Sequence, residues 1–354
     1  MSTYWALFIL PMCGVLIPIR FIERTQRKVW AVTVIVVTLI IGTRYEVGGD
    51  WQSFFEVSQY YVGKGVHVSL SHEDPLYGLL NWISVKIGLG IYGVNTVCGA
   101  LFVTGLAVFC RRQPIPWLAW LVGTPYLLVV VGMGYTRQSA ALGFLLLGLV
   151  CLEDKRVWRY FLLLVIGAAF HKTVLLGAPL AILVWRGNIW LKVAIAIVFS
   201  GTSWVMFSDY IVRLLQGYSR SGVYESIGAS YRVWMNAVPA VLFLLLRKKW
   251  VKYFDNPSLW VWIAIASIIS VFLVGYASTA VDRINIYLAP IQLYFWSRLP
   301  LLVSDRLTRT LIVTATIFFY GFMFLIWLEL AENAGNWIPY KSIISFDLMD
   351  LLLG

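Results

Sequence analysis

Long apolar runs separated by short polar stretches dominate the chain. Residues 32–41 and 126–134, for example, contain no charged side chain. Their many β-branched residues would favour strands in water. In lipid, however, every backbone hydrogen bond must be satisfied, and a helix does this within a single segment. The pattern therefore predicts membrane-spanning helices.

Basic residues gather in short clusters between these runs, which the positive-inside rule assigns to the cytoplasmic side. Applied along the chain, this rule predicts about twelve transmembrane helices, with both termini outside. Several runs are shorter than the roughly 20 residues that cross a bilayer. The expected spans are residues 4–19, 29–43, 92–110, 115–133, 138–152, 157–170, 173–185, 189–207, 232–246, 258–276, 283–297 and 310–328.

Three polar segments lie outside the expected spans. Residues 44–91 should form an external loop that includes an interfacial helix, and residues 208–231 a second external loop. Residues 329–354 should form a tail that lies on the surface. Because no repeat or linker interrupts the chain, residues 1–354 are expected to form one membrane-embedded domain. The predicted fold class is an all-α polytopic integral membrane protein with additional interfacial helices.

Composition supports this class and narrows the functions. With 60% hydrophobic and 13% charged residues and a mean hydropathy of +0.80, the chain is too apolar for a soluble domain. The net charge of +11 follows from cytoplasmic basic clusters and does not require nucleic acid. The four cysteines show no CxxC or zinc-type spacing. Neither a metal nor another cofactor is expected.

Ionisable residues converge on the expected external side. Residues 42–51 (GTRYEVGGDW) place Arg44 and Asp50 directly after an apolar run. Arginine presents a planar fork of donors that matches phosphate oxygens. We therefore expect a single anion site on this side, where arginines from distant segments bind a diphosphate. The candidates for diphosphate binding are Arg44, Arg137, Gln138, Lys172, Arg220 and Arg283.

Proton transfer and sugar binding have several candidates. His171 could accept a proton near neutral pH, and Asp50 and Asp282 are rival bases. Arg44 is also a candidate catalytic residue. The candidates for sugar contacts are Trp51, Tyr224, Asp282 and Tyr287. Each of these residues also has a simpler interpretation, as a local ion pair or a headgroup anchor.

Several short motifs together carry a family resemblance. They are Arg44, Gly48 and Asp50 after the second run, Arg137 with Gln138, Phe170 with His171, Arg283 with Tyr287, and Pro339 with Tyr340. In this order the chain resembles the EpsG-type family of bacterial polysaccharide polymerases. These are Wzy-like and similar to lipid-dependent glycosyltransferases of the GT-C class. The resemblance covers nearly the whole chain, although Lys172 stands where many relatives carry a small hydroxyl residue.

The resemblance implies a GT-C-like helix bundle in the bacterial inner membrane. It also implies polymerisation of oligosaccharide repeat units carried on undecaprenyl pyrophosphate, with the active site facing the periplasm or exterior. Expected partners are membrane lipids, a chain-length regulator and a flippase of the same pathway. Two alternatives are a transferase of single sugars from polyprenyl phosphate and a non-enzymatic flippase or transporter of lipid-linked glycans.

Overall fold

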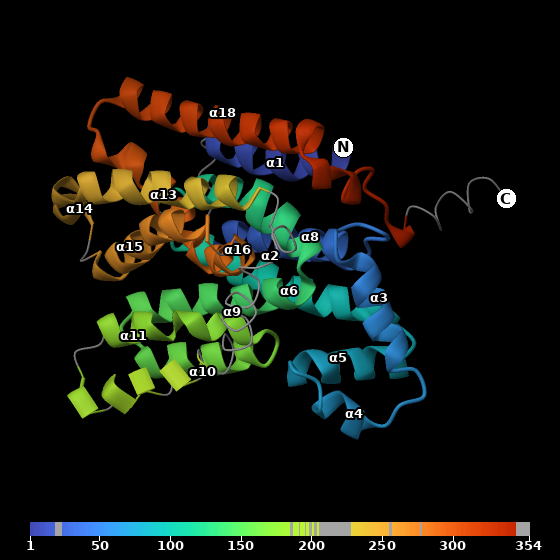
Figure 1. Cartoon of the computed structure of the whole chain (residues 1–354). Coiled ribbons are helices and arrows are strands. Elements are labelled where there is room, and N and C mark those ends of the chain that lie inside the picture. Colours follow the sequence, from blue (N-terminus) through green and yellow to red (C-terminus); the bar gives the residue numbers. More distant parts are fainter. Residues whose placement is uncertain are drawn as a thin grey trace.

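The computed structural model describes residues 1–17, 23–184, 187–190, 228–254, 257–276 and 278–344, together with short pieces between 192 and 204. Within these residues the chain is helical, and the only isolated bridge pairs Arg44 with Ser342. The predicted all-α class is confirmed. Figure 1 shows the helices packed side by side, with α3 crossing one end.

The helices of the first half are α1 (Ser2–Leu16), α2 (Glu23–Gly42), α3 (Trp51–Tyr60), α4 (Val66–Leu70), α5 (Pro75–Lys86), α6 (Gly90–Arg111), α7 (Pro116–Gly123), the π-helix η1 (Thr124–Val131), α8 (Gly132–Gly134) and α9 (Thr136–Glu153). Those of the second half are α10 (Val157–Ala168), the 3-10 helix η2 (Lys172–Gly177), α11 (Ala178–Val184), α13 (Ala229–Leu245), α14 (Arg247–Tyr253), α15 (Ser258–Leu273), α16 (Ser278–Leu288), α17 (Pro290–Trp296), η3 (Leu299–Leu302), α18 (Arg306–Leu330) and η4 (Glu332–Asn336).

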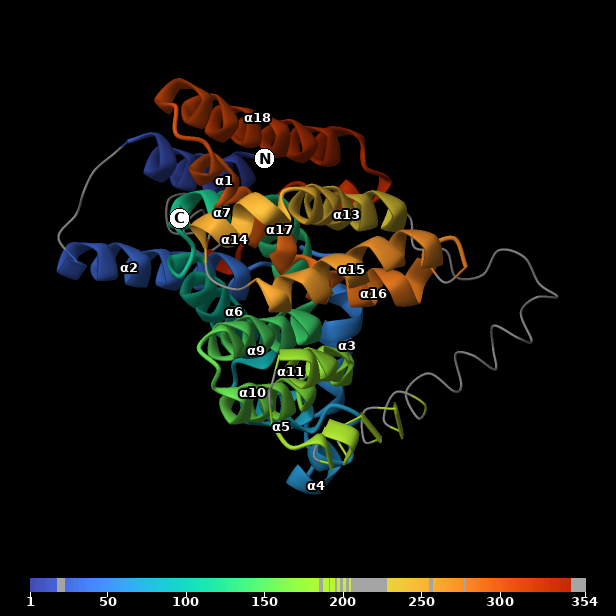
Figure 2. The same cartoon turned by 90° about the vertical axis from the view of Figure 1, so that its left-hand side faces the viewer.

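Burial differs sharply between central and outer helices. The continuous unit of α7, η1 and α8 is 94% buried over its apolar window, whereas α2 and α18 are each 28% buried. On α18 the apolar side chains of Phe318 and Phe322 are exposed. Figures 1 and 2 both show α18 on the outside, beside α1. Exposed apolar faces of this kind suit contact with lipid.

Helices α6 and α9 form the closest pair in the bundle. A Cβ atom at Gly105 of α6 would collide with the backbone of Gly143 on α9, so both small residues let the two backbones approach. The hydroxyl of Thr136 donates to Asn95 Oδ1 at 3.2 Å at one end, and Arg112 pairs with Asp154 at 2.6 Å at the other. The two helices therefore run parallel, with their starts at one end of the bundle and their ends at the other.

The predicted number of spans is not confirmed. In the described residues five helices are long and apolar enough to cross a membrane, or six if the bent pair α13 and α14 counts as one span. Most expected segments are helical but shorter: α1 has 15 residues and α10 has 12. The expected span 283–297 is divided between α16 and α17 at Pro290, which has no N–H to continue the helix. A GT-C-like bundle stays a prediction.

The first part of the predicted C-terminal surface tail, up to residue 344, has both exposed residues and residues buried against the bundle. Trp337 is buried, and its indole nitrogen donates to Val129 O at 3.2 Å. The hydroxyl of Tyr340 donates to Ile40 O at 2.7 Å. The amide of Gly48, whose φ is +108°, donates to Asn336 O at 2.8 Å. Residues 331–344, here called the C-terminal strap, thus hold the loop after α2 against the bundle.

The predicted external segment 44–91 contains three short helices, α3, α4 and α5. The amide of Leu76, at the start of α5, donates to Ala169 O at 2.9 Å. This bond ties the segment to the end of α10. The two ends of the bundle are consequently different: one carries Arg112, Asp154 and α14, and the other carries the loop after α2 and the starts of α9, α13 and α16. We call the second one the loop end.

Candidate functional site

Asp50, Arg137 and Arg283 share one electrostatic environment at the loop end. Asp50 precedes α3, Arg137 lies in the first turn of α9 and Arg283 in α16. Desolvation raises the pKa of the Asp50 carboxyl above its usual value, and the charges of Arg283 and Arg137 partly offset the rise. Asp50 and Arg283 are nevertheless exposed to solvent. These three residues, which lie 87 and 146 positions apart in the sequence, are thus close enough in the structure for their charges to interact.

Gln138 orients the segment that carries Arg283. Its amide nitrogen donates to Arg283 O at 2.8 Å. This bond joins the first turn of α9 to α16 and leaves the guanidinium of Arg283 exposed. In the part of the chain that the structure describes, Arg283 has no recorded ion pair. The side chain is therefore available to an anion.

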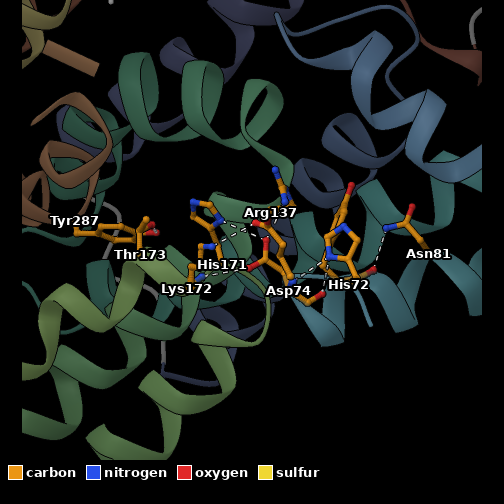
Figure 3. A network of polar contacts seen from close by, with 10 residues as sticks. His72, Asp74, Asn81, Arg137, His171, Lys172, Thr173 and Tyr287 are labelled. Atoms are coloured by element: carbon orange, nitrogen blue, oxygen red, sulfur yellow. Dashed lines mark hydrogen bonds and ion pairs between the residues drawn. The ribbon is translucent and has the colours of Figure 1, made fainter. Parts of the chain in front are cut away.

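Asp74 is the centre of a second group beside Arg137 (Figure 3). Its side chain is only 2% exposed. Arg137 Nη1 donates to Oδ2 at 2.9 Å, and the backbone N–H of Lys172 donates to Oδ1 at 3.3 Å. His171 Nδ1 lies 3.5 Å from Oδ2. Burial raises the pKa of the Asp74 carboxyl, but the contacts and charges of His171 and Arg137 outweigh this and hold the pKa below its usual value.

Lys172 and Tyr287 flank this group. Lys172 Nζ pairs with the exposed Glu73 at 3.3 Å. The hydroxyl groups of Tyr287 and Thr173 lie 2.9 Å apart, and Tyr287 is buried. An internal partner and burial do not favour the predicted sugar contact of Tyr287.

Asp282 and Arg232 form a bidentate ion pair at the start of α16 and α13. Arg232 Nε donates to Oδ1 at 2.6 Å, and Nη2 donates to Oδ2 at 2.8 Å. Both side chains are mostly buried. The geometry is that of a strong, oriented salt bridge. It supports a structural role for Asp282, which the sequence suggested as a base and as a sugar contact.

Arg44 is buried beneath the loop rather than exposed in it. Its guanidinium donates to Ile41 O at 2.5 Å, to Val47 O at 3.2 Å, to Asn95 Oδ1 at 3.0 Å and to Thr136 Oγ1 at 2.8 Å. Burial lowers the pKa of Arg44 to about 10, so the side chain stays protonated at neutral pH. The predicted contact with a diphosphate would require these bonds to open. The structure instead favours a role in holding the loop.

Trp51 is also internal. It is 8% exposed and packs against Tyr45 and Tyr92, with ring centroids 6.1 and 6.0 Å away. Burial of its ring does not favour the predicted sugar contact. Two further candidates, Arg220 and Tyr224, lie outside the described residues.

The sequence analysis missed Asp74 and Arg232 as site residues. Asp74 lies in the segment SHEDP, next to Glu73, and polarity alone does not distinguish two adjacent acids. One local signal was available, because Asp74 precedes Pro75 at the start of α5 and is the N-cap residue there. Among the described residues, no group of three or more His, Cys, Asp or Glu side chains converges as a metal site. The expected lack of a cofactor stays a prediction.

Comparison with known proteins places the chain in a family. The model of the EpsG family matches residues 27–342, which includes every described residue of the loop end discussed above. The chain, whose described part is helical and contains five or six helices suited to crossing a membrane, is a membrane protein and belongs to the EpsG family, a polysaccharide polymerase-like family. Comparisons with curated proteins and with solved structures gave no match.

Proposed function

We propose that the chain is a polysaccharide polymerase that joins oligosaccharide repeat units carried on undecaprenyl pyrophosphate. One observation carries the proposal: an EpsG family chain gathers Asp50, Arg137 and Arg283 at a single end of a membrane bundle. The basic clusters at the other end support a cytoplasmic position for that end. The loop end would then face the periplasm or exterior of a bacterial inner membrane.

The proposed reaction needs a cationic site for the leaving group. The hydroxyl oxygen of the acceptor sugar forms a bond to the anomeric carbon of the donor chain, and the bond from that carbon to the diphosphate breaks. Undecaprenyl pyrophosphate departs with the electron pair. Arg283 and the free part of the Arg137 guanidinium stabilise its negative charge.

The acceptor proton needs a base at the same site. Asp50 and His171 both lie at the loop end, and either can take it. Desolvation makes the Asp50 carboxylate more basic than a solvated one. The imidazole of His171 is 14% exposed, so one edge is reachable.

The experiment is to follow polysaccharide length in cells with and without this chain. Loss of the long-chain ladder, with one repeat unit retained, is the expected result. Incubation of the purified protein with lipid-linked repeat units should then restore a ladder and release undecaprenyl pyrophosphate. A single added sugar would identify the single-sugar transferase instead. If cells without the chain trap repeat units on the cytoplasmic face, and the purified protein forms no glycosidic product, the chain is a flippase.

A further inference from the structure

Asp74 contacts two candidate groups of the loop end at once. Its Oδ2 atom faces Nη1 of Arg137 at 2.9 Å and Nδ1 of His171 at 3.5 Å. These two residues come from α9 and from the turn after α10. Figure 3 shows Asp74 between them. A buried carboxylate that holds a cation on one side and an imidazole on the other determines their relative position.

The surroundings of Asp74 make it rigid. Its backbone N–H donates to His72 Nδ1 at 2.9 Å, and its carbonyl accepts from the amide of Gly78 at 2.9 Å in the first turn of α5. The backbone N–H of Lys172 holds the other carboxylate oxygen. The low pKa of Asp74 keeps the carboxylate charged across the physiological range. It can therefore accept hydrogen bonds only, and cannot donate them.

An acceptor at this position selects one form of His171. Because the carboxylate 3.5 Å from Nδ1 can only accept a hydrogen bond, it favours the neutral imidazole that carries its proton on Nδ1. Nε2 then has a free lone pair. Nδ1 is sealed from solvent and makes no hydrogen bond, so its 3.5 Å approach to Asp74 Oδ2 is an ion-pair contact. Nε2 is not sealed, and within the described residues it makes no hydrogen bond either. The nitrogen that can accept a proton is thus the accessible one.

The same carboxylate anchors only part of the Arg137 fork. Nη1 is bound to Asp74, and the side chain remains 34% exposed. The ring of Tyr77 lies 5.6 Å below the guanidinium carbon. The remaining N–H groups are free to meet an anion. Asp74 consequently fixes the position of Arg137, which can donate hydrogen bonds to an anion, relative to His171, which can act as a base.

We propose that Asp74 is the positioning residue of the loop end, and this rests on the proposed function. It holds His171 in the Nδ1–H form, so that Nε2 takes the proton of the acceptor hydroxyl as that oxygen bonds to the anomeric carbon. It also fixes Arg137 beside the departing diphosphate. The imidazolium formed on His171 is stabilised by the adjacent carboxylate, which itself stays unprotonated.

The first test needs no substitution. The chain has three histidines, so the nitrogen signals of a 15N-histidine-labelled protein can be assigned with His67→Gln and His72→Gln variants. His171 should show a protonated Nδ1 and a bare Nε2 when neutral, and Asp74→Ala should abolish that preference. A proton on Nε2 in the wild-type protein would overturn the proposal, and this readout does not depend on polymerase activity.

The second test is a double-mutant cycle measured with lipid-linked repeat units. Asp74→Asn and His171→Ala should each slow chain extension by about 100-fold or more. The double variant should be no slower than the slower single variant, because His171 cannot act as a positioned base once Asp74 is replaced. Multiplied losses, or an Asp74→Asn rate within about threefold of wild type, would overturn the proposal. Asp154→Asn, which breaks the ion pair with Arg112 at the other end, is the matched control.

Failure of this proposal differs from failure of the proposed function. If the wild-type protein makes no polymer, the proposed function is wrong. If the protein makes polymer and Asp50→Asn alone abolishes it, with His171→Ala active, the polymerase stands and the positioning role of Asp74 falls. Unfolding temperatures of all variants separate loss of rate from loss of fold.

Discussion

Arg44 and Arg283 lie at the same end of the same bundle, yet their surroundings differ completely. Arg44 is 1% exposed and gives four hydrogen bonds to uncharged acceptors. Arg283 is exposed and has no recorded ion pair in the described residues. A buried cation with all its acceptors supplied by the protein stabilises a loop. An exposed cation beside Arg137 and Asp50 can instead meet a ligand, so residue type alone does not define a site.

The C-terminal strap sharpens the contrast. The loop that contains Arg44 pairs with it through the bridge between Arg44 and Ser342 and through a bond from Tyr45 N to Lys341 O at 3.0 Å. The Asp50 side of the same loop carries no side-chain cap for α3. One half of the loop is therefore fastened to the bundle, and the other half presents its carboxylate to solvent.

The largest expected effect is on the fastened half. Arg44→Ala removes one buried donor each from Asn95, Thr136 and two carbonyl groups, and should lower the free energy of unfolding by about 3 kcal/mol or more. Thermal unfolding of the purified protein in detergent measures this. Arg112→Ala, an exposed arginine at the other end, is the matched control. A variant as stable as wild type would remove the structural role that we assign to Arg44.

Next in size is the effect of Arg283→Ala, which removes the exposed arginine of α16 at the loop end. It should slow polymerisation by roughly 100-fold, the usual loss when one donor to a developing negative charge is removed. The unfolding temperature should stay unchanged, because the side chain is exposed. The rate is measured with lipid-linked repeat units, and Arg306→Ala on α18 provides a control. Equal rates for Arg283→Ala and wild type would mean that Arg283 binds no diphosphate.

Asp50→Asn should separate stability from activity. The fold raises the pKa of Asp50 and so favours its neutral form. That contribution to stability is complete below the unfolded pKa of about 3.9 and is lost as pH rises through the raised value. At pH 7 the amide should therefore be at least as stable as wild type, while chain extension falls. A drop in unfolding temperature at pH 7 would show that the carboxylate is needed for the fold.

The smallest effect is expected at the edge of the strap. Lys341 Nζ pairs with Glu46 at 2.8 Å, and both side chains are exposed. Solvent screens such pairs, so Lys341→Ala should leave the free energy of unfolding nearly unchanged. Urea unfolding measures the free energy of unfolding of this variant and of Arg44→Ala, and the loss should be smaller for Lys341→Ala. A larger loss for Lys341→Ala would mean that charge, rather than buried hydrogen bonding, fastens the loop.

The sequence determined the helical class and the positions of most helices. Lipid leaves the backbone no other way to satisfy its hydrogen bonds, so apolar runs became helices despite their β-branched residues. The expected runs 92–110, 138–152 and 310–328 correspond closely to α6, α9 and α18. The charged residues at the ends of the apolar runs also predicted which side chains gather at the loop end, because ionised groups are costly inside the hydrocarbon layer.

Only the tertiary structure decided which of these residues are buried and which are paired. Asp74 meets Arg137 across 63 positions and Lys172 across 98, and Thr43 meets Ser342 across 299. No local period marks such partners, because they depend on how α5, α9 and the strap pack. The same packing encloses Arg44 and leaves Arg283 open. Burial is a property of the whole bundle, so it could not be derived from the residues around either arginine.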